Sequence, residues 1–79
     1  MKELLTYIAQ NLVDSPDAVV VTERDDGDKT VFSLRVAPDD MGKVIGRHGK
    51  IAKEIRALMR SVAQRQNKHI SVDILDENE

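Results

Sequence analysis

The chain has 79 residues, enough for one domain with a modest hydrophobic core. It contains no cysteine, which excludes disulfides and thiolate metal sites, and its formal net charge of −2 gives no indication of a polyanion-binding protein. No apolar run reaches the length of a signal-peptide core or a membrane span, so we expect a soluble, cytoplasmic protein with a single domain over residues 1–79.

The first segment, residues 2–13, has the periodicity of an amphipathic helix. Its apolar residues would form one buried face: Leu4, Leu5, Ile8 and Leu12. Ser15 precedes Pro16, which disfavours the α conformation at Ser15, so the helix should end near Asp14.

Two short stretches rich in β-branched residues, 18–24 and 30–37, flank a turn sequence at 25–28 and predict a β-hairpin. In the second stretch, Phe32, Leu34 and Val36 would point into the core and the residues between them mostly toward solvent. The acidic turn lacks the ligand spacing and the closing glutamate of a calcium loop, so we interpret it as a solvated hairpin tip.

A short helix over residues 41–44 should follow, with Asp39 or Asp40 as its N-cap. A longer helix is expected over residues 50–66, with an apolar face at helical spacing: Ile51, Ile55, Leu58, Met59 and Val62. Asn67 would end this helix.

The chain should close with a strand over residues 69–75 and a frayed tail over residues 76–79. In that strand Ile70, Val72 and Ile74 would face the core.

Between the two later helices, Gly46 and Gly49 are separated by two residues. Glycine has no Cβ, so the backbone there can turn tightly and another backbone can approach it closely. The amides of Lys50 and Ile51 should lack helical partners and carry the positive end of the helix dipole, which favours an anion such as phosphate. A G-x-x-G pattern alone also fits a simple turn between helices.

The charges of the chain are strongly segregated. Residues 41–68 hold a single acid, Glu54, against eight basic residues: Lys43, Arg47, Lys50, Lys53, Arg56, Arg60, Arg65 and Lys68. This segment therefore carries a formal +7 and the rest of the chain −9, a distribution typical of a polyanion-binding patch on an acidic body. A solvated basic helix face is the alternative interpretation.

Three of these cations, Lys53, Arg56 and Arg60, recur at spacing that puts them side by side on one helix surface. Neighbouring like charges cost a few tenths of a kcal/mol per pair. Phosphate binding would offset that cost, so we interpret this face as functional.

The loop resembles the signature of the K-homology (KH) family, I-G-x-x-G-x-x-I, which it matches at Ile45, Gly46, Gly49 and Ile51. The second apolar position falls at Ile51 rather than one residue later. The expected element order, α-β-β-α-α-β, is that of the type II KH fold. This agreement does not depend on the motif. The resemblance implies an α+β fold in which three helices cover one face of a three-stranded sheet, with the second and third strands parallel.

The resemblance also implies function. KH domains bind about four nucleotides of single-stranded RNA between the G-x-x-G loop, its flanking helices and the last strand. On this chain the loop and its neighbours would hold the sugar-phosphate backbone and apolar residues would support the bases, which gives this set of RNA-binding residues: Val44, Ile45, Gly46, Arg47, His48, Gly49, Lys50, Ile51, Lys53 and Arg56. Similar small bacterial proteins with one KH domain are regarded as RNA chaperones or post-transcriptional regulators that work with a KH-containing partner linked to cell-envelope growth and cell shape.

The sequence also bears on functions other than RNA binding. His48 lacks a partner spaced for general-base catalysis, and two isolated histidines, His48 and His69, make a poor metal site, so we expect no enzyme, cofactor or metal. Single-stranded DNA binding and a role as a protein-interaction adaptor stay open. A single KH site binds weakly, so we expect a homodimer, or a heterodimer with another KH-domain protein, formed through the apolar arc of residues 58–63. A charge at Val62 should then separate the dimer or unfold the chain.

Overall fold

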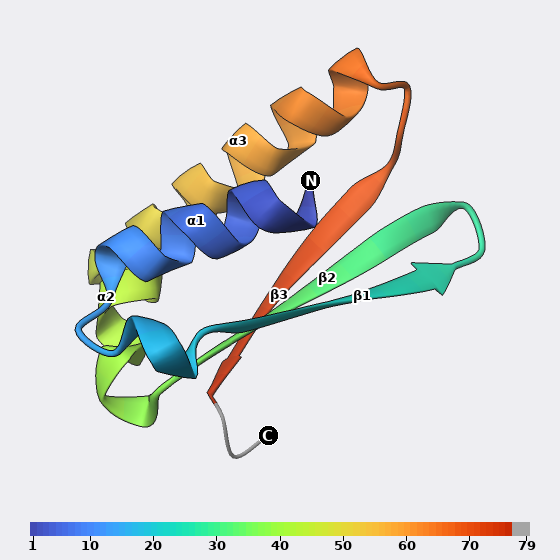
Figure 1. Cartoon of the computed structure of the whole chain (residues 1–79). Helices are drawn as coiled ribbons and strands as arrows, with labels where there is room; N and C mark the ends of the chain where they lie inside the picture. Colours follow the sequence, from blue (N-terminus) through green and yellow to red (C-terminus); the bar gives the residue numbers. More distant parts are fainter. Residues whose placement is uncertain (77–79) are drawn as a thin grey trace.

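The computed structural model describes residues 1–76. Within them the secondary structure follows the order α1 (Lys2–Leu12), β1 (Val20–Asp26), β2 (Lys29–Val36), α2 (Met41–Ile45), α3 (Lys50–Arg65) and β3 (Ile70–Asp76). Single turns of 3-10 helix precede β1, α2 and α3, at Pro16–Ala18, Pro38–Asp40 and Arg47–Gly49. The predicted α-β-β-α-α-β order is confirmed, and all three α-helices lie on one face of the sheet (Figure 1).

The sheet has the strand order β1-β2-β3. Strands β1 and β2 pair antiparallel, from Val20 with Arg35 to Asp26 with Lys29. Strands β2 and β3 pair in parallel, as predicted, from Thr30 with Ile70 to Val36 with Asp76. Because β3 has only β2 as a neighbour among the described residues, its other side is an edge of the sheet.

The hairpin is tighter than predicted. The first strand begins at Val20, because residues 16–18 form a helical turn, and it continues through Asp25 and Asp26, which were expected in the turn. Gly27 has a φ of +69°, so the chain reverses in the two residues 27–28.

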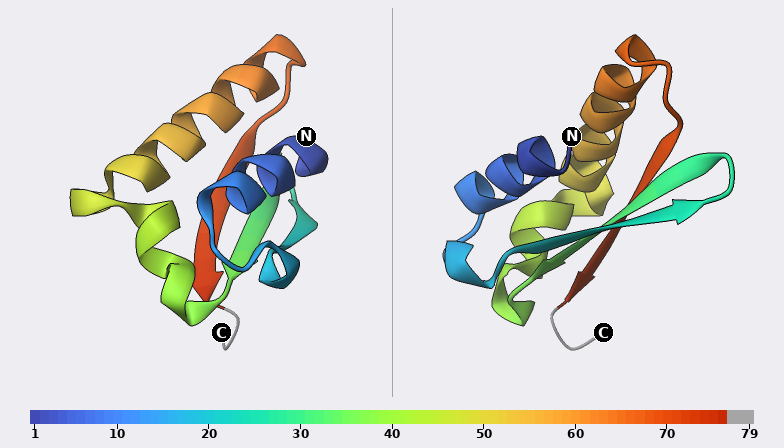
Figure 2. Two further views of the ribbon diagram at one scale, coloured as in Figure 1. Left: turned by 60° about the vertical axis from the view of Figure 1, so that its left-hand side comes forward. Right: turned by 45° about the vertical axis from the view of Figure 1, so that its right-hand side comes forward.

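The core lies between the helices and the inner face of the sheet, where α3 packs against β3 and α1 against β1 (Figure 2). Its fully buried members from the sheet and the helices include Leu5, Leu34, Val36, Val44 and Met59. The predicted inward faces of the last two strands are confirmed. The opposite face of β2 is less exposed to solvent than expected, because Val31 is only 4% exposed between its register neighbours Arg24 and Ser71.

The remaining predictions concern the end of α3 and the end of β3. Asn67 adopts a left-handed φ of +55°, and the amide of Lys68 donates to the carbonyl of Ala63, which completes a Schellman cap and confirms the predicted helix end. Asp76 is the last residue of β3 and pairs with Val36, so the prediction of a frayed tail is wrong for this residue. Residues 77–79 of that tail lie outside the described residues.

Candidate nucleic-acid interface

The G-x-x-G loop is a single helical turn held in a conformation that requires glycine at both ends. Gly46 has φ 76° and ψ 176°, a region that only glycine occupies readily, and Gly49 has φ 75° and ψ 15°, in the left-handed region. Backbone hydrogen bonds close the turn, from the amide of Gly46 to the carbonyl of Gly42 and from the amide of Gly49 to the carbonyl of Gly46.

His48 is also left-handed, with φ 57° and ψ 25°. This conformation costs a residue with a Cβ about 1 to 2 kcal/mol. The side chains of Arg47 and His48 are exposed, so the loop presents both of them to solvent.

One prediction about the loop is wrong. The amide of Lys50 donates to the carbonyl of Arg47, because the helical turn of the loop runs directly into α3. The Lys50 amide is therefore already hydrogen-bonded and is not available to an anion at this helix terminus.

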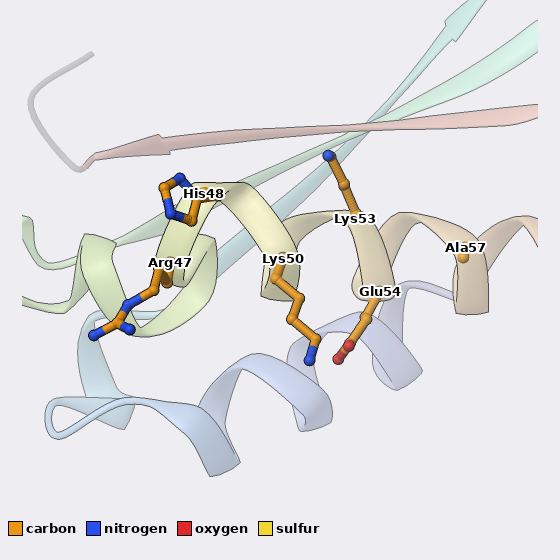
Figure 3. Close-up of a pocket in the computed structure, with 6 residues that line it drawn as sticks. All are labelled: Arg47, His48, Lys50, Lys53, Glu54 and Ala57. Carbon is orange, nitrogen blue, oxygen red and sulfur yellow. The ribbon is translucent and has the colours of Figure 1, made fainter.

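The basic side chains at the start of α3 divide between two sides of the helix. His48 and Lys53 point toward the side where the strands lie, whereas Arg47 and Lys50 point toward the side where α1 lies (Figure 3). A shallow depression of about 550 Å³ lies over these side chains, with Glu54 and Ala57 completing its lining.

On the strand side, α3 carries a row of cations that we call the basic strip: Lys53, Arg56 and Arg60. The Nε–H of Arg56 donates to the carbonyl of Val72 at 3.1 Å, which fixes this side of α3 against β3. Arg56 and Arg60 also line a recess of about 150 Å³ together with Ile70, Ser71 and Val72. The strip predicted from helical spacing thus faces the edge strand of the sheet.

The order of helices and strands is the one expected of a KH domain, and the sequence comparison decides the family. A sequence model described as the KH domain of KhpA and KhpB matches residues 2–74. The chain belongs to this family.

Named relatives agree with the assignment to the KhpA/KhpB family. The RNA-binding protein KhpA of Clostridium acetobutylicum is 48% identical over 75 residues, which is 95% of this chain and all of the relative. The protein of the same name from Halalkalibacterium halodurans is 47% identical over 76 residues, 96% of this chain and all of the relative. The KhpA of Chlamydia trachomatis is 44% identical over 77 residues, 98% of this chain and 99% of the relative.

Solved structures support the KH fold. A crystal structure of Era from Aquifex aeolicus superimposes with a TM-score of 0.65 at 16% identity, covering 95% of this chain and 29% of that one. A structure of Era in complex with MgGDPNP and a segment of 16S ribosomal RNA gives a TM-score of 0.59 with the same identity and coverage. At this identity the likeness shows the fold alone.

The apolar residues predicted to support the bases are placed differently from one another in this KH domain. Val44 is completely buried in the core. Ile45 and Ile51 are half-buried and pack against the edge of the core beside the loop. Val44 and Ile45 differ in burial because successive residues of the short helix α2 point in different directions.

A buried carboxylate anchors this part of the KH domain. Asp40, 2% exposed, accepts hydrogen bonds from the amides of Asp14 and Ser15 at 3.2 and 3.0 Å. It occupies the predicted N-cap position of α2, but its side chain makes no capping bond there. Asp40 instead ties the segment that follows α1 to the start of the helix that leads into the loop.

Lys43 reinforces the same junction from the surface. Its Nζ lies 3.1 Å from Oδ2 of Asp14 and 3.8 Å from Oδ1 of Asp40. The hydrogen bond to Asp14, followed by the attraction of that carboxylate, raises the pKa of Lys43 above its ordinary value. The sequence offered no signal for the bonds of Asp40 to Asp14 and Ser15, because these partners lie 26 and 25 positions apart.

A second surface of the KH domain is apolar. A groove of about 310 Å³ lies between α1 and α3, lined by Ile8, Leu12, Ile51, Glu54, Ile55 and Leu58. Leu58 is 47% exposed, more than expected for a residue on the predicted apolar face. Two small residues outside the predicted apolar face, Ala52 and Ala63, are buried.

Among residues 1–76, no group of three or more His, Cys, Asp or Glu side chains is arranged to hold a metal ion. Within the same residues, no helix is long and apolar enough to cross a membrane.

Proposed function

We propose that this KH domain binds single-stranded RNA between its G-x-x-G loop, the basic strip and the open edge of β3. The observation that carries the proposal is the position of the strip: Lys53, Arg56 and Arg60 line up beside an edge strand, and the loop lies at the start of the same helix. The names of the KhpA relatives, which describe RNA-binding proteins, support the same function.

In this proposal the residues have distinct roles. The loop, Gly46 to Gly49, holds the sugar-phosphate backbone of about four nucleotides. Lys53 and Arg56 add charge on the strand side, and Arg47 and Lys50 lie on the opposite side of the helix, where they would contact a strand entering or leaving the site. Ile45 supports the bases, and the buried Val44 packs beneath it. Ile51 lines the groove between α1 and α3, so its part in the site is to pack against the loop.

The cellular role rests on the family resemblance alone. We assign the protein to the cytoplasm as an RNA chaperone or post-transcriptional regulator, working with another KH protein and linked in that way to cell-envelope growth and cell shape.

The scarcity of aromatic residues, 3% of the chain, favours a KH-type site, in which aliphatic side chains support the bases, over a site in which the bases stack on aromatic rings.

The apolar groove between α1 and α3 favours dimerisation as a second property. Exposed apolar surface of this kind marks an interaction site when polar residues surround it. We propose that a second copy of the chain, or another KH protein, covers Ile8, Leu12 and Leu58. Two linked RNA sites would then act with an increased effective concentration, which compensates for the weak binding of one site.

A charge reversal in the loop tests the RNA proposal. Arg47→Asp combined with His48→Asp should abolish binding to a short single strand, because two carboxylates would repel phosphate. Both side chains are exposed, so the circular dichroism spectrum should be unchanged. Lys2→Asp with Gln10→Asp, two exposed positions on α1, is the matched control and should bind normally.

Gel-shift titrations of the loop variant and the control decide the outcome. Wild-type affinity in a folded loop variant would refute the site. Equal affinity for RNA and for DNA of the same sequence would extend the site to single-stranded DNA, and binding to neither, with an intact apolar groove, would favour the adaptor function.

A further inference from the structure

The recess beside Arg56 has a chemical character that the proposed function does not specify. It lies between α3 and the edge of β3 and is lined by Arg56, Arg60, Ile70, Ser71 and Val72. Two of these lining residues are bonded to each other: the Nε–H of Arg56 donates to the carbonyl of Val72 at 3.1 Å. The arginine is half-buried, so part of its side chain is held within the protein.

The direction of the strand's peptide groups follows from two hydrogen bonds. The carbonyl of His69 accepts from the amide of Thr30, so residue 69 directs its peptide groups toward β2. Peptide groups alternate sides along a strand, which places those of Ile70, Val72 and Ile74 on the open edge. The bond from Arg56 to the Val72 carbonyl agrees with this alternation.

An open strand edge normally offers amide donors and carbonyl acceptors in turn. Such an edge suits a base that presents a donor beside an acceptor, as adenine does with its amino group and N1, and cytosine with its amino group and N3. Here one acceptor of the edge, the Val72 carbonyl, is already bonded to Arg56. An amino group of a base entering at this point would compete with the guanidinium for that carbonyl.

The guanidinium of Arg56 occupies the Val72 carbonyl and presents N–H donors to the recess in its place. Its bond to Val72 uses Nε–H, and its two Nη nitrogens carry four further N–H groups in a planar fork. Arg60 adds a second guanidinium at the same recess. The surface that a base would meet here is therefore rich in donors.

We infer that Arg56 makes this recess selective for guanine, whose O6 and N7 are both acceptors. Arginine pairs with these two atoms through a bidentate contact, whereas adenine would direct its amino group at the donors of Arg56. The bond to Val72 also holds the guanidinium in place before RNA arrives, which reduces the entropy lost on binding. This inference rests on the proposed RNA-binding function and adds a base preference to the same site.

The test measures the binding of labelled RNA octamers by fluorescence anisotropy. Each octamer is a run of adenosines whose central nucleotide is guanosine, adenosine or 7-deazaguanosine, because adenine carries an amino group where guanine has O6. Wild type should bind the guanosine octamer about tenfold more tightly than the adenosine octamer, as one bidentate contact allows. The 7-deazaguanosine octamer, which lacks N7, should lose most of this preference.

Arg56→Lys is the decisive variant, because lysine keeps the charge but cannot form the fork. Its preference for guanosine should fall to within about twofold. Arg65→Lys, an exposed arginine in the last turn of α3 and outside the recess, is the matched control and should keep the wild-type preference.

The results separate the inference from the function on which it rests. Equal affinity of wild type for the guanosine and adenosine octamers, or a guanosine preference that survives in Arg56→Lys, would overturn the inference and leave RNA binding intact. Failure of wild type to bind any of the octamers would overturn both.

Discussion

Ile51 packs directly against the backbone of Gly46. A Cβ added at residue 46 would lie 2.6 Å from Cγ1 of Ile51 and 2.9 Å from its amide nitrogen, closer than real Cβ contacts. The glycine is therefore required for space as well as for its φ of +76°. This contact holds the start of α3 against the loop.

A series of glycine-to-alanine substitutions should separate these two requirements. Gly46→Ala should cost roughly 2 to 5 kcal/mol of unfolding free energy, since it combines a forbidden backbone region with a steric clash. Gly49→Ala, where nothing lies within 4 Å of the new Cβ, should cost only about 1 to 2 kcal/mol. Urea unfolding followed by circular dichroism gives both values, and equal losses at the two positions would contradict the packing argument.

Gly42 provides the control for the glycine series. It lies within α2, its φ is not positive, and no atom lies within 4 Å of the position of an added Cβ. Gly42→Ala should stabilise the fold by up to about 1 kcal/mol, because alanine loses less conformational entropy in a helix.

Asp40→Ala should destabilise the protein by about 2 to 4 kcal/mol, because it leaves the amides of Asp14 and Ser15 without their acceptor. Asp40→Asn retains one carbonyl oxygen and should cost less. Asp39→Ala, at the exposed neighbouring residue, is the control and should change the unfolding free energy by no more than about 0.5 kcal/mol. Thermal and urea unfolding measure all three, and a neutral Asp40→Ala would show that water satisfies these amides equally well.

RNA affinity should fall steeply with salt. Each phosphate that a cation neutralises releases counterions, and the four to five basic residues near the loop and strip predict a slope on the order of −3 in log K against log salt. Titrations with a short single strand between low and physiological ionic strength measure this slope. A flat response, or equal affinity for a duplex of the same length, would be inconsistent with the proposed site.

Leu58→Glu should separate the proposed dimer without unfolding the chain, because Leu58 is 47% exposed at the apolar groove. Val62, the position suggested by the sequence, is half-buried, so a charge there would also disturb the fold. Ser61→Glu, an exposed position on the same helix, is the control. Sedimentation velocity of the three proteins gives the association state, and a wild type that remains monomeric at high concentration would refute the dimer.

The sequence was sufficient for the features that depend on local pattern. Apolar periodicity predicted the helices and strands, because a residue's face in a helix or strand follows from its spacing. Gly46 and Gly49 identified the loop, because only glycine adopts these backbone conformations readily. The excess of positive charge in residues 41–68 identified the basic segment without any structure.

The tertiary structure decided which surface each of these residues occupies. Spacing gives the angle between two residues on a helix, but the direction of the helix itself depends on packing against the sheet. Only the structure shows that Arg56 meets the edge of β3, that Lys50 points to the other side of α3, and that Leu58 is exposed. The bonds of Asp40 to Asp14 and Ser15 were equally inaccessible, because contacts between residues distant in sequence form only when the packed core brings their segments together.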